Sequence, residues 1–66
     1  MRLTVNGESY EFVDEVTVSE LLEYLNLSGQ FVAVECNHSI ISYKTFQTAK
    51  LCDGDVVELV TLVGGG

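Results

Sequence analysis

The first twelve residues, MRLTVNGESYEF (residues 1–12), have the pattern of a β-hairpin. Apolar and polar residues alternate on both sides of Asn6-Gly7, which places Leu3 and Val5 on the same face of the first strand. Asn-Gly is a strong hairpin signal, because a type I′ turn needs positive φ at both central residues. The chain is therefore predicted to begin with two antiparallel strands that share one buried face.

A helix is predicted directly after the hairpin. Thr17 and Glu20 have the spacing of a capping box, in which each side chain accepts a hydrogen bond from the backbone amide of the other residue. Apolar residues then recur at the i, i+3, i+4 and i+7 positions of one helix face, namely Val18, Leu21, Leu22 and Leu25. The pattern predicts a helix that ends near Asn26 and packs against the hairpin.

Three further strands are predicted at residues 31–36, 39–41 and 56–63. Ser42 is placed to cap a single helical turn before the last of them. The turn Cys52-Asp53-Gly54-Asp55 precedes the final strand, and its two carboxylates could suggest a metal site. A calcium loop needs several more oxygen ligands at fixed spacing, so turn chemistry explains these residues better.

The final strand runs into three terminal glycines, Gly64, Gly65 and Gly66. Such a run is expected by chance at roughly 3 in 10,000, given an average glycine usage of about 7%. A frayed terminus or a linker remnant would also produce it. We interpret residues 1–63 as a single domain and residues 64–66 as a flexible tail.

The strand before this tail has apolar residues on both faces. Period-two alternation places Val57 and Leu59 on the core side. The opposite face then carries Glu58, Val60 and Leu62, which we predict to be a docking patch for a partner protein. The alternative is that these are scattered surface residues of the ordinary kind.

Composition narrows the function classes. The chain has 66 residues, is 47% hydrophobic and has a formal net charge of −7 with only three cationic side chains. Binding to nucleic acid is not expected, because neutralising phosphates needs clustered Lys and Arg. The sequence shows neither an apolar run long enough to span a membrane nor a signal segment, so we expect a cytoplasmic protein that does not bind membranes.

The sequence offers no catalytic or metal-binding constellation of its own. Cys36 and Cys52 lack CxxC spacing and are expected to be reduced thiols. His38 stands alone in a predicted turn, and a zinc site would need about four ligands. With no nucleophile and base in a recognisable pattern, we expect that the chain is not an enzyme and binds no cofactor.

The order of hairpin, helix, strand, short strand, small turn and final strand predicts a two-layer α+β domain. With its Gly-Gly end, this order resembles the ubiquitin-like β-grasp fold, in which a mixed five-stranded sheet packs on one helix. The chain is more closely similar to the prokaryotic thiamin sulfur carrier family, ThiS, over essentially its whole length. The segments that carry the resemblance are residues 17–22, 32–34, Asn37 with 40–41, 53–55 and 65–66.

One segment departs from the family pattern. The family often has Val-Pro-Arg after the short fourth strand, whereas here Ile41 is followed by Ser42-Tyr43. Any part that the family Arg plays in partner contacts is therefore not carried over to this chain. Lys44 lies close by in sequence and could substitute for it.

The resemblance implies a carrier chemistry at the C-terminus. A ThiF-type adenylyltransferase would use ATP and magnesium to convert the Gly66 carboxylate to an acyl-adenylate. A sulfur donor such as a cysteine desulfurase would then yield a thiocarboxylate, and a ThiG-type thiazole synthase would take the sulfur. The alternatives are a molybdopterin-synthase small subunit, which shares the fold and the terminus, and a ubiquitin-like binding module or protein modifier.

Overall fold

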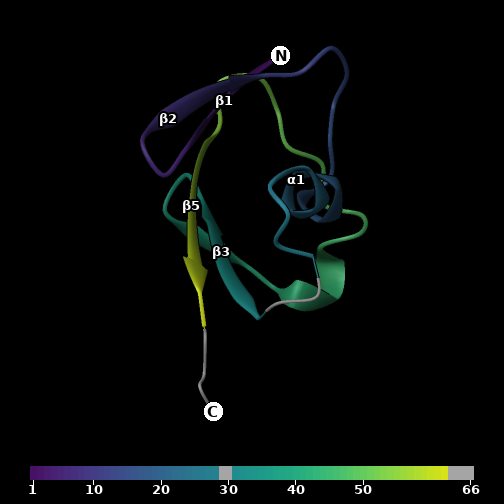
Figure 1. Ribbon diagram of the computed structural model, residues 1–66, viewed down its shortest axis with the longest axis vertical. Coiled ribbons are helices and arrows are strands. Elements are labelled where there is room, and N and C mark those ends of the chain that lie inside the picture. The colour runs from purple at the N-terminus through teal and green to yellow at the C-terminus, as the bar shows by residue number, and fades with distance from the viewer. Residues whose placement is uncertain (29–30, 63–66) are drawn as a thin grey trace.

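The computed structural model of the protein describes residues 1–28 and 31–62. Within these residues the chain forms one five-stranded sheet, an α-helix and a short 3₁₀ helix (Figure 1). The strands are β1 (Arg2–Val5), β2 (Glu8–Glu11), β3 (Val32–Cys36), β4 (Ser39–Ile41) and β5 (Val56–Thr61). The helix is α1 (Val18–Tyr24), and the 3₁₀ helix is η1 (Tyr43–Thr45).

The sheet is mixed and has the strand order β2-β1-β5-β3-β4. β1 and β5 pair in parallel, whereas β1 with β2, β3 with β4 and β3 with β5 pair antiparallel. The helix lies to one side of the sheet, so the domain has two layers (Figure 1). The predicted α+β, ubiquitin-like β-grasp architecture is confirmed.

Two two-residue turns connect antiparallel strands. The predicted Asn6-Gly7 turn joins β1 to β2 with φ of 49° and 82° at its two residues. Asn37-His38 joins β3 to β4 with φ of 51° and 72°. Both pairs have the positive φ values that a type I′ turn requires. The second turn has a histidine where the first has glycine.

The helix begins as predicted and ends close to the predicted residue. Thr17 Oγ1 accepts from the Glu20 amide at 3.1 Å, and Glu20 Oε1 accepts from the Thr17 amide at 2.8 Å, which completes the capping box. The helix was expected to end near Asn26, and its last residue is Tyr24, with Leu25 as the C-cap. Asn26 adopts a φ of 64°, a left-handed conformation that cannot continue an α-helix.

The core lies between α1 and the inner face of the sheet. The residues that are both apolar and buried are Leu3, Val5, Val18, Leu21, Leu22, Val32, Val34, Leu51, Val57 and Leu59. Tyr24 extends this contact at the end of α1, since its ring meets Tyr10 and Phe12 edge-on with centroids 6.3 and 5.1 Å apart. The predicted packing of the helix on the hairpin is confirmed.

Two strands, β3 and β5, are shorter than the alternation pattern predicted. β3 begins at Val32, and Phe31, which is 81% exposed, lies outside the strand. β5 ends at Thr61, although the Leu62 amide still donates to the Phe31 carbonyl oxygen at 2.7 Å. Val63, which was expected in the strand, lies outside the described residues.

Candidate functional site

The sequence places the candidate reactive group at Gly66 and its tail at Gly64 and Gly65, all of which lie outside the described residues. The structure does describe the segment that leads to them. We call residues 59–62 the tail root, since they connect the core of the domain to the C-terminus. The geometry of the tail root sets how the domain presents its end.

Along β5 the side chains change from buried to exposed. Val57 is completely buried and Leu59 is 8% exposed, whereas Val60 and Leu62 are 58% and 54% exposed. Glu58 is exposed as well. The predicted alternation holds for Glu58 and Val60, which lie on the face of the sheet that turns away from α1. The prediction for Leu62 was wrong, because β5 ends at Thr61 and Leu62 borders the helix side instead.

Glu58 and Val60 lie in a shallow depression on that outer face of the sheet. Strand pairing places Glu58 opposite Glu35, and Val60 opposite Ala33. Ile40, on β4, lies opposite Glu35 and is 81% exposed, so it completes the depression. Ile40 was not predicted to belong to this surface, because alternation within a three-residue strand does not show which neighbours complete a surface.

The outer depression combines apolar and acidic groups. Glu35 and Glu58 are like charges on directly opposite positions of an antiparallel pair, an arrangement that destabilises a sheet. The ion pair that the structure shows in its described residues is elsewhere, between Arg2 and Glu11. An apolar surface that carries two unneutralised carboxylates can accept a partner surface with a cationic side chain.

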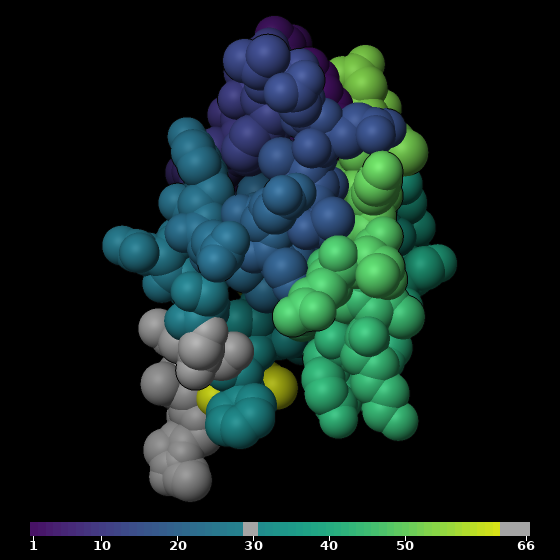
Figure 2. Space-filling model, turned by 90° about the vertical axis from the view of Figure 1, so that its right-hand side faces the viewer, coloured from purple at the N-terminus to yellow at the C-terminus, as the bar shows by residue number. Residues whose placement is uncertain are grey.

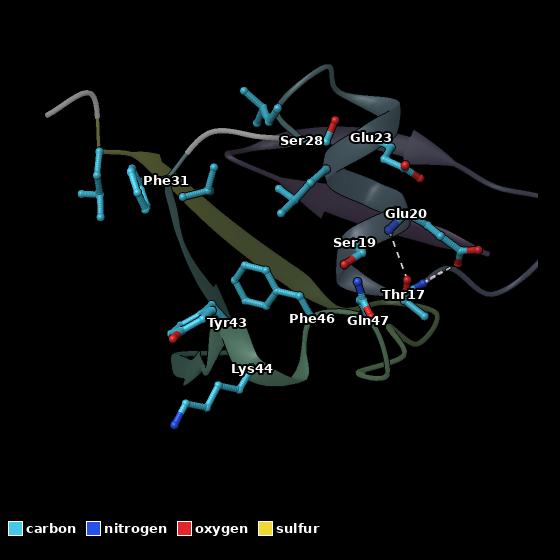
Figure 3. Close-up of a pocket in the computed structure, with 14 residues that line it drawn as sticks. Thr17, Ser19, Glu20, Glu23, Ser28, Phe31, Tyr43, Lys44, Phe46 and Gln47 are labelled. Atoms are coloured by element: carbon cyan, nitrogen blue, oxygen red, sulfur yellow. Dashed lines mark hydrogen bonds between the residues drawn. The ribbon is translucent and has the colours of Figure 1, made fainter. Parts of the chain in front are cut away.

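Leu62 lines a different hollow, on the helix side of the sheet. This open groove has a volume of about 1150 Å³ and lies between α1, the start of β3 and η1 (Figure 3). Its apolar lining includes Leu27, Phe31, Tyr43, Phe46 and Leu62. Figure 2 shows the end of β5, in yellow, at the lower end of this face. The three predicted docking residues thus border two separate surfaces that meet at the tail root.

Local structure explains how the groove is formed. Ser42 caps η1 by accepting from the Lys44 amide at 3.2 Å, as predicted. The Ser19 amide at the start of α1 donates to the Phe46 carbonyl oxygen at 2.9 Å, which ties η1 to the helix. In Figure 3, Phe46 reaches toward the middle of the groove, whereas the Lys44 side chain points away from α1.

The acidic turn before β5 has a structural role. Asp53 Oδ1 accepts from the Arg2 amide at 2.7 Å, and Asp55 accepts from the Cys52 amide at 2.8 Å and from Asn37 Nδ2 at 3.0 Å. Partial burial on its own would raise the pKa of Asp55, but hydrogen bonds from Cys52, Asn37 and the Cys36 thiol outweigh it and lower the pKa. These carboxylates are committed to turn geometry, in agreement with the interpretation from sequence.

Neither cysteine nor histidine forms a reactive arrangement in the described residues. Cys36 and Cys52 are free thiols. Burial and the neighbouring Asp55 carboxylate raise the pKa of Cys36 to about 11, so this thiol remains protonated at neutral pH. His38 is an exposed turn residue. Among residues 1–28 and 31–62, no group of three or more His, Cys, Asp or Glu side chains could hold a metal ion.

Comparison with known proteins identifies the family. The sequence model of the ThiS family matches residues 3–66, which is nearly the whole chain and includes the terminal glycines. The chain belongs to the ThiS family. As a member of this family it is a small sulfur carrier protein of thiamin biosynthesis.

No α-helix in the described residues is long and apolar enough to cross a membrane.

Individual relatives agree with this assignment. The chain is 38% identical to the sulfur carrier protein ThiS of Bacillus subtilis over 65 residues, which cover 97% of this chain and 98% of that protein. Its structure matches the crystal structure of the thiamine biosynthesis protein ThiS from Geobacter metallireducens with a TM-score of 0.83 and 35% identity, and the match covers both chains completely.

A third relative is a larger protein. The chain is 38% identical to a segment of the thiazole synthase of Paramagnetospirillum magneticum over 66 residues. The match covers all of this chain but only 20% of that protein. A segment similar to this ThiS family member is therefore contained within a longer thiazole synthase chain.

Proposed function

We propose that this ThiS family member carries sulfur on the carboxylate of Gly66, in the cytoplasm, and that a ThiF-type adenylyltransferase activates it. The observation that carries the proposal is the match of the family model through to residue 66, so that the terminus itself belongs to the family pattern. Among the described residues, the Cys36 thiol stays protonated at neutral pH and no cluster of side chains could hold a metal ion, so neither offers an alternative centre. The chain is a co-substrate and leaves catalysis to its partners.

The chemistry follows from the weak electrophilicity of a carboxylate. In the first step, an oxygen of Gly66 attacks the α-phosphorus of ATP, pyrophosphate leaves, and an acyl-adenylate forms. The terminal sulfur of a persulfide, supplied by a donor such as a cysteine desulfurase, then displaces AMP. Two-electron reduction of the resulting S–S bond by a thiol leaves the Gly66 thiocarboxylate. ATP and magnesium belong to the adenylyltransferase in this scheme, and the carrier itself holds no cofactor.

The three glycines suit this role. Residues without Cβ adopt a wide range of backbone conformations and allow close approach to another chain. A tail of Gly64, Gly65 and Gly66 can therefore enter a channel that side chains would block. Ordering the backbone costs about 1–2 kcal/mol per residue, so contacts made by the folded domain must offset that cost.

We propose that the docking patch of Glu58, Val60 and Leu62 provides these contacts, together with their neighbours on the two surfaces at the tail root. Leu62 and Val60 are half-exposed apolar side chains four and six positions before Gly66. A thiazole synthase of the ThiG type is the proposed sulfur acceptor. The thiazole synthases that contain a ThiS-like segment support this pairing, since they join the two proteins in one chain.

Pyrophosphate release in the presence of the adenylyltransferase, ATP and magnesium tests the first step. The intact chain is expected to support release, and a variant that lacks Gly66 is not. Gly65→Val is expected to lower the rate at least about 100-fold, because a β-branched side chain blocks the channel. Normal release with Gly65→Val would remove the argument that the channel is narrow.

Leu62→Asp tests the docking patch separately. We expect this variant to raise the KM for the adenylyltransferase about tenfold, because it places a charge in an apolar contact. Thermal stability should remain within about 0.5 kcal/mol of the parent, since Leu62 is more than half exposed. A large loss of stability would instead show that Leu62 belongs to the core.

A further inference from the structure

Strand β5 extends beyond the strand that supports it on one side. β1 pairs with β5 only at Thr4 with Val56 and at Val5 with Val57. After Val5 the chain turns away at Asn6-Gly7, whereas β5 continues to Thr61. Because every second residue of a strand directs its N–H and C=O toward the same neighbour, Leu59 faces the position that β1 has just left.

The side chain of Asn6 occupies that position. Asn6 Oδ1 accepts from the Leu59 amide at 2.7 Å, and Asn6 Nδ2 donates to the Leu59 carbonyl oxygen at 3.2 Å. The Asn6 backbone amide also donates to the Val57 carbonyl oxygen at 2.9 Å. A side-chain amide has the same donor and acceptor as a peptide group, so Asn6 extends the parallel ladder by one further step.

This contact is the last one on the β1 side that the structure shows before the C-terminus. The next attachments of β5 come from the opposite side, where Thr61 pairs with Val32 and the Leu62 amide donates to Phe31 at 2.7 Å. On the β1 side, the direction in which the tail root leaves the sheet therefore depends on one side-chain amide, while β3 holds the other side. The contact joins residues that are 53 positions apart in the sequence.

Because the contact lies several residues before Gly66, a small change in the direction of the tail root would displace the terminus by a larger distance. Gly66 lies seven residues beyond Leu59, a distance of about 23 Å for a chain drawn out in a partner's channel. A tilt of about 10° at the root would move the end of such a chain by roughly 4 Å. Reacting groups that are misplaced by about 1 Å can already lose about 100-fold in rate.

We propose that Asn6 is a positioning residue for the carrier reaction. Through its two hydrogen bonds to Leu59 it aims the tail root, so that the domain docks with the carboxylate directed at the nucleotide. The role rests on the proposed function of Gly66. It is separate from the part that Asn6 plays in the turn, where its φ of 49° requires only a residue that tolerates the left-handed region.

Asn37 offers a matched control. It has a similar φ of 51° in the other two-residue turn, and it also holds β5 with its side chain and backbone. Its contacts are with Asp55 and Val56 at the start of β5, away from the tail root. Substituting either asparagine with glycine keeps the positive φ accessible and removes only the side-chain bonds.

The test compares kcat/KM for adenylation, measured as pyrophosphate release with the ThiF-type enzyme, at a temperature where thermal melts show every variant folded. Asn6→Gly is expected to lower kcat/KM about five- to tenfold, by the loss of the hydrogen bonds that aim the root. Asn37→Gly should change kcat/KM less than about twofold.

A second measurement separates positioning from general stability. Amide hydrogen exchange at Leu59 and at Leu62, whose amide donates to the Phe31 carbonyl oxygen, should be faster in Asn6→Gly and unchanged in Asn37→Gly. Equal losses of kcat/KM in the two glycine variants, or none in Asn6→Gly, would overturn the proposal and leave Asn6 a turn residue. Failure of the proposed function looks different, since the parent chain itself would then release no pyrophosphate.

Discussion

Two asparagine turns hold β5, one near each end of the strand, and the two ends are built differently. At the start, Asn37 brackets Val56 with its backbone and side chain, and the Asp53 and Asp55 carboxylates fasten the preceding turn. At the end, Asn6 alone holds the β1 side at Leu59. The start of β5 therefore has a neighbouring strand on both edges, whereas its end pairs only with β3 and leads to the C-terminus.

The two ends of β5 also differ in how far their side chains are exposed to solvent. Val57 and Leu59 are buried in the core, while Val60 and Leu62 are more than half exposed. A strand that passes from core to surface within a few residues concentrates stability at one end and partner contacts at the other. Substitutions along β5 should therefore separate folding from function.

The largest expected effect comes from comparing Leu59, inside β5, with Leu62, just after its end. Leu59→Ala should lower the free energy of unfolding by about 2–5 kcal/mol, because it leaves a cavity in a small core. Leu62→Ala should change it by no more than about 0.5 kcal/mol. Urea denaturation of both variants checks this, and equal losses would show that the strand has no such division.

Asp55→Asn tests the hydrogen bonds that the Asp55 carboxylate accepts just before β5. We expect a loss of about 1 kcal/mol at pH 7, because the carboxylate accepts charge-assisted hydrogen bonds from Cys52 and Asn37. The lowered pKa of Asp55 means that its contribution is present above the unfolded pKa of about 3.9 and is lost as the pH falls through the folded value. Stability measured against pH should therefore fall less steeply below about pH 4 in the variant than in the parent. An unchanged acid slope would exclude Asp55 as its source.

His38→Gly makes the second turn resemble the first. His38 has a φ of 72°, which is strained for a residue with a Cβ. Glycine relieves this strain but loses more entropy on folding, so we expect a net gain of about 0.5 kcal/mol in thermal or chemical denaturation. A loss of stability would indicate that the imidazole makes a favourable contact in its turn.

Glu58→Gln, in the middle of β5, should have the smallest effect and the opposite sign from most substitutions. Removing the charge opposite Glu35 is expected to stabilise the chain by a few tenths of a kcal/mol. If the pair serves a basic partner surface, the same variant should bind the adenylyltransferase more weakly. Titration calorimetry alongside denaturation would reveal both changes, and unaltered affinity would remove Glu58 from the docking patch.

The elements of this fold follow from local chemistry that the sequence displays. Asn6-Gly7 specifies its turn through backbone conformation, and Thr17 with Glu20 specifies the helix start through hydrogen bonds three residues apart. Alternation along residues 56–61 likewise separates buried from exposed side chains. Each of these signals involves residues that are close in the chain, so composition and spacing are sufficient to find them.

The contacts that shape the candidate site are long-range and could not be predicted in this way. Alternation shows which face of the sheet a residue occupies but not which strand lies beside it. It therefore did not predict that Ile40 and Glu35 share one surface with Glu58. The bond from Asn6 to Leu59 depends on β1 ending before β5 does. Alternation also did not show that β3 would begin at Val32 and leave Phe31 exposed.

The most direct test of the carrier role is the intact mass of the chain after incubation with the adenylyltransferase, ATP, magnesium, a persulfide donor and a thiol reductant. The account predicts a gain equal to the mass of sulfur minus that of oxygen, located by fragmentation on Gly66 and absent when ATP is omitted. A chain of unchanged mass, or a gain located on Cys36 or Cys52, would contradict it.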